Sequence, residues 1–158
     1  MEKLTPKHSA FEQALRFLDR RALSEAELHK KLQRYAYTAS EISAAVYACR
    51  QRGFINDSLL ISDFRDGLFS RGNGPRMIKA KLRRRGLDPN AVSAALEETR
   101  DQETDSCRIA AEYKLRLLTR ENDMRKKREK LYRYLAGRGF NTNVISQIIS
   151  EKKEAFIQ

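Results

Sequence analysis

The chain repeats one apolar pattern three times, at intervals of 50 and 53 residues. Leu32, Leu82 and Leu135 stand at equivalent places in the three copies. Two further sets follow the same spacing: Ile42, Val92 and Ile145, and Val46, Leu96 and Ile149. A long internal repeat decides the architecture, because each copy is one small unit that buries its apolar face against its neighbours. The sequence therefore predicts a curved array of units rather than one rounded core.

Each copy contains three stretches in which apolar residues recur at helical spacing. We therefore expect an all-α protein of three tandem three-helix repeats that form an elongated, curved solenoid. The repeats are placed at residues 1–56, 57–103 and 104–158. Extra charged residues at 119–128 predict a longer first loop or second helix in the third repeat. The first helices are expected to bury Phe11, Ala14, Leu15 and Leu18, then Ile61, Phe64 and Leu68, then Ala110, Tyr113, Leu117 and Leu118.

The second helices begin at recognisable capping residues. Ser24 is followed three positions later by Glu27, a capping box in which each side chain satisfies a free backbone N–H of the other residue. At the same boundary the second repeat has Gly74 and Pro75. Proline suits the first helical position because its missing N–H was unpaired anyway. Both sequences predict a helix start at this place.

The third helices also begin at matching places, after residues that are good N-caps. These N-caps are Thr38, Asp88 and Asn141. Gly86 and Gly139 fit the turn before the cap, because glycine adopts a left-handed conformation without strain. The first repeat has Ala36 there, which predicts a turn of different shape.

Positive charge gathers at two places in a chain of net charge +11, and such an excess favours anionic partners. Arg76, Lys79 and Arg83 have helical spacing, so they are expected to form one stripe beside the apolar face. A solvated surface would also explain basic residues. Two clusters on equivalent helices favour binding of an anion or a partner. The candidate partner- or DNA-binding residues are Arg71, Arg76, Lys79, Arg83, Arg84 and Arg85, with Arg125, Lys126, Lys127, Arg128, Lys130 and Arg133.

Few residues suggest catalysis. His8 and His29 lack a second ligand at helical spacing, and no phosphate-binding glycine motif ending in GKS or GKT is present. Cys49 and Cys107 do not form a CxxC pair, so we expect reduced, buried thiols. No secretory segment or membrane-length apolar run is seen, which predicts a soluble, cytoplasmic protein. We expect no enzyme activity, no metal and no cofactor.

Several short segments, in this order, resemble the RecX family of bacterial recombinase regulators. They are RRALSEAEL at residues 20–28, GFIND at 53–57, GNGPRMI at 72–78 and RGL at 85–87. Asn56 stands where the family commonly has an acidic residue, and Leu60 stands where an aromatic residue is common. The resemblance is clearest over about 90 residues and looser over the rest of the chain, where the third repeat matches least.

The resemblance implies three tandem three-helix repeats and a non-enzymatic regulator. RecX-like proteins lodge in the groove of the filament that the RecA recombinase forms on single-stranded DNA, and they restrain recombination. A basic, elongated monomer fits such a partner, since the filament offers acidic protein surface and a DNA backbone. Binding to naked DNA is then expected to be weak and independent of sequence.

An autonomous DNA-binding protein is the alternative interpretation, with each repeat acting as a helix-turn-helix. Such a protein reads bases from the start of a recognition helix. The third helices begin ASE at 39–41, PNA at 89–91 and TNV at 142–144, without arginine. This counts against sequence-specific reading. A purely structural scaffold, a third possibility, would not need the basic clusters.

Overall fold

The structure is a computed structural model that describes residues 3–97 and 99–152, and over these residues it is helical, without a β-strand. Leu4 and Tyr35 make an isolated parallel bridge. The all-α prediction is confirmed. The helices are α1 (Ala10–Leu18), α2 (Glu25–Leu32), α3 (Ala39–Gln51), α4 (Asp57–Phe69), α5 (Pro75–Arg84), α6 (Pro89–Glu97), α7 (Arg100–Leu117), α8 (Met124–Gly137) and α9 (Thr142–Glu151).

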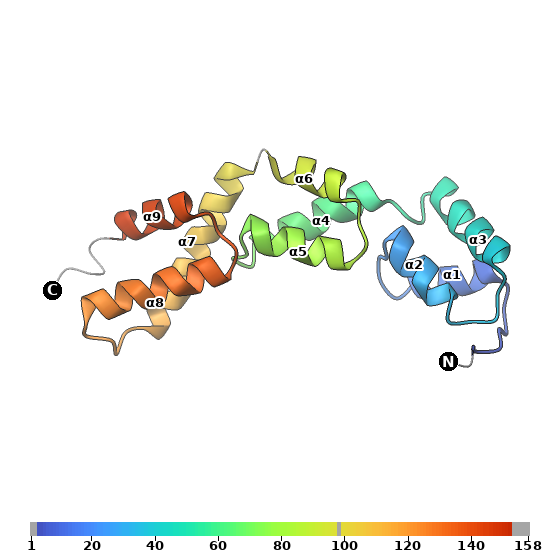
Figure 1. Ribbon diagram of the computed structural model, residues 1–158, viewed down its shortest axis with the longest axis horizontal. Helices are drawn as coiled ribbons and strands as arrows, with labels where there is room; N and C mark the ends of the chain where they lie inside the picture. Colours follow the sequence, from blue (N-terminus) through green and yellow to red (C-terminus); the bar gives the residue numbers. More distant parts are fainter. Residues whose placement is uncertain (1–2, 98, 153–158) are drawn as a thin grey trace.

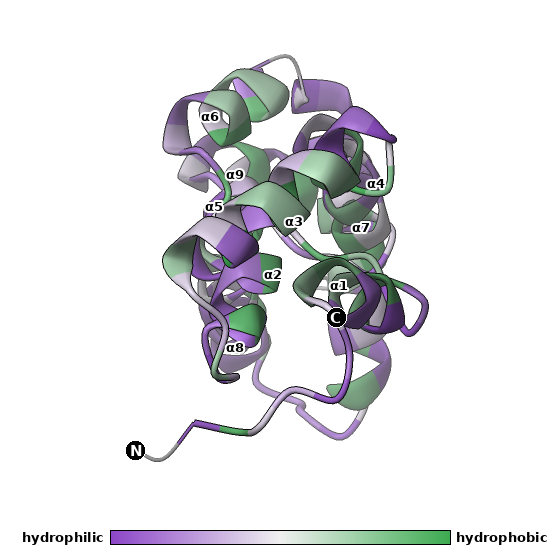
Figure 2. Ribbon diagram, turned by 90° about the vertical axis from the view of Figure 1, so that its right-hand side faces the viewer, coloured by the Kyte–Doolittle hydropathy of each residue, from purple (hydrophilic) through white to green (hydrophobic). Residues whose placement is uncertain are grey.

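Three groups of three helices lie in a row, and the row is elongated and arched (Figure 1). Unit one contains α1–α3, unit two α4–α6 and unit three α7–α9. Seen from the end, the second helices α2, α5 and α8 lie along one side and the first helices α1, α4 and α7 along the other (Figure 2). The predicted division between residues 103 and 104 falls inside α7, which begins at Arg100.

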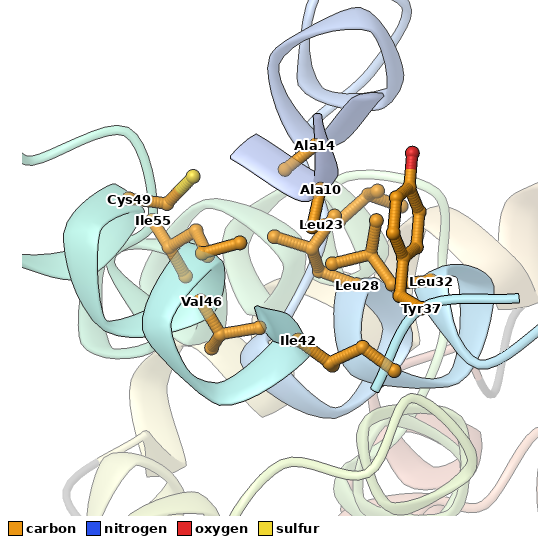
Figure 3. Close-up of a cluster of buried hydrophobic side chains, with 11 residues drawn as sticks. Ala10, Ala14, Leu23, Leu28, Leu32, Tyr37, Ile42, Val46, Cys49 and Ile55 are labelled. Carbon is orange, nitrogen blue, oxygen red and sulfur yellow. The ribbon is translucent and has the colours of Figure 1, made fainter. Parts of the chain in front are cut away.

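Each unit has its own hydrophobic core. Leu32, Leu82 and Leu135 have no exposed surface and belong to three separate clusters, as the repeat predicted. In unit one, side chains from all three helices meet around Leu28 and Ile42 (Figure 3). No residue is shared between the clusters of the described chain. The predicted row of three repeats is therefore present, with a separate hydrophobic core in each unit.

One core prediction is wrong, because α7 buries a face made of small residues. Tyr113 and Leu117, predicted to face the core, are 55% and 60% exposed. Ala110 is buried as predicted, and the other buried residues of α7 are Glu103, Ser106, Cys107 and Ala111. Small side chains let neighbouring backbones approach closely: a Cβ added to Gly72 would lie 3.1 Å from the Cβ of Ala110.

The predicted caps hold at most helix starts. Ser24 and Thr38 form complete capping boxes, and Pro75 begins α5 after Gly74. Asn141 is the exception, because its side chain makes no cap hydrogen bond. Its backbone amide and its side-chain amide donate instead to the buried Glu103 carboxylate, over 2.7 and 2.8 Å. That carboxylate therefore fastens the start of α9 to α7.

Units two and three are joined by backbone hydrogen bonds between helix ends. The Gly74 amide donates to the Arg138 carbonyl over 2.9 Å, and the Arg76 amide donates to the Gly139 carbonyl over 3.1 Å. A Cβ on Gly74 would lie 2.3 Å from the Gly139 carbonyl carbon. The buried Ser106 hydroxyl adds a hydrogen bond to the Phe69 carbonyl over 2.7 Å. Only glycine, which has no Cβ, permits so close a contact between these two backbone segments.

The turn before α3 in unit one differs from the turns before α6 and α9, as the presence of Ala36 predicted. Gly86 and Gly139 have φ of 74° and 88° at this place, whereas no described non-glycine residue has a positive φ. Near the chain start, the Leu4 amide donates to the Arg34 carbonyl and the Leu4 carbonyl accepts from the Ala36 amide, both over 2.9 Å. The first corner is therefore held by the segment around Leu4.

We expect Leu82→Ala to lower the free energy of unfolding by about 2–5 kcal/mol, because it leaves a cavity in a fully buried site. Leu59→Ala is the control, since Leu59 is 57% exposed and its truncation should change stability by less than about 0.5 kcal/mol. Urea unfolding followed by circular dichroism measures both. Equal stability of the two variants would contradict the assignment of Leu82 to a core.

Gly139→Ala is expected to destabilise the protein more than Gly53→Ala. Both residues have positive φ, so both substitutions carry a backbone strain of about 1–2 kcal/mol. A Cβ at residue 139 would also meet the Met77 amide nitrogen at 2.5 Å, whereas a Cβ at residue 53 meets nothing within 4 Å. The same unfolding experiment compares them. An equal loss of stability at both positions would show that the close contact between units two and three adds no steric cost to Gly139→Ala.

Candidate functional site

The basic residues of α5 do not all face solvent as one stripe. Arg83 and Arg84 are exposed in the last turn, and no described acidic group lies within ion-pair distance of them. The Lys79 ammonium donates to the Ser93 hydroxyl of α6 over 2.8 Å. The Arg76 guanidinium donates to the Ala136 carbonyl of α8 over 3.2 Å. The predicted stripe is therefore divided between an open end and two residues engaged with neighbouring helices.

Arg85 belongs to the joint between units one and two. Its guanidinium donates to Glu27 over 2.7 Å and to the Ala22 carbonyl over 2.8 Å, and its side chain is only 12% exposed. Burial opposes ionisation of Glu27, but hydrogen bonds from Arg85 and from the Ser24 backbone outweigh burial and lower the pKa of its carboxyl. Arg85 therefore has a structural role at this joint, and its charge is already paired within the chain.

The same joint contains a second polar contact and a tight steric one. The Glu25 amide donates to the Asp57 carboxylate over 3.1 Å, and the Ser24 hydroxyl donates to the Arg85 carbonyl. Burial raises the pKa of the Asp57 carboxyl, against the effect of the Glu25 amide. A Cβ on Gly86 would lie 2.6 Å from the Cβ of Ala26. The hydrogen bonds of the first joint thus involve side chains, whereas the second joint also contains hydrogen bonds between backbone groups.

The basic residues of α8 fall into two groups. Three have acidic partners: Lys126 with Asp123 at 3.6 Å, Lys130 with Glu121, and Arg133 with Glu129 at 3.2 Å. The other three make no ion pair with any described acid. These are Arg125, Lys127 and Arg128. The open charge of this helix therefore lies in its first turns.

Arg125 and Arg128 line a groove of about 510 Å³ between α8 and α9. The other lining residues are Glu129, Tyr132, Ser146 and Ile149. The sequence pattern pointed to the two arginines but not to this groove. The signal that could have revealed it is the repeat: Tyr132 and Ser146 stand 53 residues after Lys79 and Ser93.

The remaining candidate, Arg71, is exposed in the loop between α4 and α5. Its carbonyl accepts a hydrogen bond from the Arg138 guanidinium over 3.2 Å. Arg71 therefore lies beside the second joint, between the helices that carry the two clusters. Those helices, α5 and α8, follow one another along the same side of the array (Figures 1 and 2).

The two thiols are buried and unpaired, as expected. Burial raises the pKa of Cys107 to about 12, so this thiol stays protonated at neutral pH and is a poor nucleophile. Residues 3–97 and 99–152 contain no group of three side chains arranged to hold a metal ion. Within the same residues, no helix combines the length and the apolar character that a bilayer span requires.

Known proteins resemble this chain along nearly its whole length. Two family models match it: that of the first three-helix domain of RecX over residues 10–46, and that of the third over residues 101–149. The regulatory protein RecX of Legionella pneumophila (strain Corby) is 30% identical over 149 residues, which cover 94% of this chain and 97% of that protein. The regulatory protein RecX of Chlorobaculum tepidum is 32% identical and covers 90% of this chain and 88% of its own.

Solved structures show the same fold. The crystal structure of RecX from Lactobacillus salivarius superimposes with a TM-score of 0.80 over 92% of this chain and 95% of that chain, at 24% identity. A second crystal structure, of a regulatory protein RecX, gives a TM-score of 0.79 at 20% identity. The row of three-helix units is therefore an architecture that experiment has already found.

Proposed function

The chain belongs to the RecX family, and we propose that it is a non-enzymatic regulator of the RecA recombinase. In this proposal it binds as a monomer in the groove of the RecA–DNA filament and mainly inhibits recombination and repair activity. The observation that carries the proposal is the arched row of three units, with open basic residues on two second helices of one side. A long surface of this kind suits a polymeric partner better than a small molecule.

The joints favour several simultaneous contacts along a filament. Backbone hydrogen bonds and close glycine contacts hold unit three against unit two, so the α5 and α8 clusters keep a defined spacing. Contacts that are linked in this way gain through effective concentration, without any one of them being tight. A rigid row of weakly binding units can therefore span neighbouring subunits and hold them in one state.

DNA contributes in this proposal through its phosphates. Arg83, Arg84, Arg125, Lys127 and Arg128 are the residues of the two clusters whose charges are not engaged by described acids. Phosphate contacts position a protein on DNA but carry no base information. Weak binding without sequence preference is the expected behaviour.

Replacing both Arg83 and Arg84 with Ala should weaken binding to all DNA sequences alike. For single-stranded DNA, the slope of log affinity against log salt concentration should decrease by about 0.7 for each phosphate contact that is lost. Fluorescence anisotropy at several salt concentrations measures this slope. Arg20→Ala combined with Arg34→Ala is the control of equal charge, with both residues exposed in unit one. A strong preference for one duplex sequence that survives the α5 change would favour a helix-turn-helix reader.

Removing unit three by ending the chain at Gln102 tests the bridging mechanism. The core of unit two contains no residue of unit three, so the shortened protein should remain helical. It should require about tenfold more protein for half-inhibition of DNA-dependent ATP hydrolysis by RecA, because linked contacts are lost. Circular dichroism and ATPase assays on the same sample measure both properties. A folded fragment that inhibits as well as the full chain would refute bridging through the α8 cluster.

A further inference from the structure

The groove between α8 and α9 differs from the same place in unit two. There the Lys79 ammonium donates to the Ser93 hydroxyl and so connects α5 to α6. In unit three the residues at the same register are Tyr132 and Ser146, which line an open groove of about 510 Å³. Helix α8 has 14 residues where α5 has 10, and its added residues at the start extend the groove to Arg125. Unit three therefore has an accessible groove at the place where unit two has a hydrogen bond between its second and third helices.

The groove lining combines apolar and cationic side chains. Its apolar residues are Ile149, which is 5% exposed, and Tyr132, which is 38% exposed. The guanidinium groups of Arg125 and Arg128 have no ion-pair partner among the described residues, although three other basic residues of α8 do. Arginine binds carboxylates in a planar, two-bond arrangement, and tyrosine and arginine are enriched at the energetic centres of protein interfaces.

We propose that this groove is a docking site for a short acidic and apolar segment of a protein partner. An apolar side chain of the segment packs between Tyr132 and Ile149, and flanking carboxylates bind Arg125 and Arg128. The proposal rests on the proposed function only in taking the regulated partner to be a protein. It names a ligand chemistry and a subsite for unit three.

The number of aromatic rings favours a peptide over a nucleic acid at this place. Glu129 also lies in the groove lining, paired with Arg133 on α8, and its charge acts on phosphates and carboxylates alike. Single-stranded nucleic acids bind through successive stacked bases, whereas the groove lining offers the one aromatic ring of Tyr132. A carboxylate beside an apolar side chain matches the lining more closely than a sugar–phosphate backbone.

Tyr132→Lys in the full chain tests the proposal, because it restores the residue of unit two while adding a positive charge. The probe is a labelled, terminally blocked peptide of sequence GSDEFLDEFLSG, measured by fluorescence anisotropy. Tyr132→Lys should weaken peptide binding about tenfold, because loss of the apolar ring should outweigh the added attraction for the carboxylates of the peptide. Binding of a short oligothymidylate should stay equal or become tighter, since the added charge attracts phosphate. Circular dichroism checks that the variant is folded.

Two charge variants and a second peptide complete the experiment. Arg125→Gln with Arg128→Gln should weaken binding of the probe about tenfold, whereas Arg20→Gln with Arg34→Gln, which removes the same charge from unit one, should change it less than about threefold. A peptide of equal charge without apolar residues, GSDESGDESGSG, should bind more weakly than the probe.

Several results would overturn the proposal: no binding of the probe, equal binding of both peptides, or undiminished probe binding by Tyr132→Lys. Loss of oligothymidylate binding in Tyr132→Lys would instead assign the groove to nucleic acid. None of these outcomes depends on RecA, so failure here is distinguishable from failure of the filament hypothesis.

Discussion

Successive second helices meet end to end, and this contact sets the shape of the whole array. The first amides and the last carbonyls of a helix have no partner within that helix. At the second joint the Gly74 amide, at the start of α5, donates to the carbonyl of Arg138, the C-cap of α8. At the first joint the Ser24 hydroxyl, at the start of α2, donates to the carbonyl of Arg85, the C-cap of α5. Opposite ends of two helix dipoles also attract one another. The units are therefore held in line by satisfied helix ends, with a closed core inside each unit.

The segment around Leu4 makes in unit one the contact that a neighbouring unit makes in units two and three. In units two and three, the turn before the third helix packs against the start of the second helix of the preceding unit. Gly86 makes this contact with α2, and Gly139 makes it with α5. In unit one, the backbone of Leu4 pairs with that corner. Terminal elements of repeat proteins commonly cover a surface that a neighbouring repeat covers elsewhere. A corner that meets only a thin segment can accept Ala36, whereas corners packed against a helix use glycine.

The sequence predicted what depends on one helix and missed what depends on two units. Helical spacing identified the buried leucines, and capping chemistry located the helix starts at Ser24 and Thr38. It placed Tyr113 and Leu117 in the core of unit three because these bulky residues looked more core-like than Cys107 and Ala111. Close packing selected the small residues, and that choice depends on how near another backbone lies. The structural role of Arg85 was missed for the same reason, since its partner Glu27 is 58 positions away and in another unit.

The two basic clusters differ in their effect on the stability of their own helices, because they lie at opposite ends of the helix dipole. Arg83 and Arg84 stand in the last turn of α5, where positive charge stabilises a helix through its dipole. Their placement has a structural reason even without a partner. Arg125 and Arg128 stand near the start of α8, where the dipole disfavours positive charge and the first turn contains no acid. Asp123 offsets part of this repulsion as the N-cap: the hydrogen bond from the Lys126 amide, with the charges of Lys126 and Arg125, lowers the pKa of its carboxyl. Basic residues that oppose the stability of their own helix require a reason outside it, and an anionic partner in the adjoining groove supplies one.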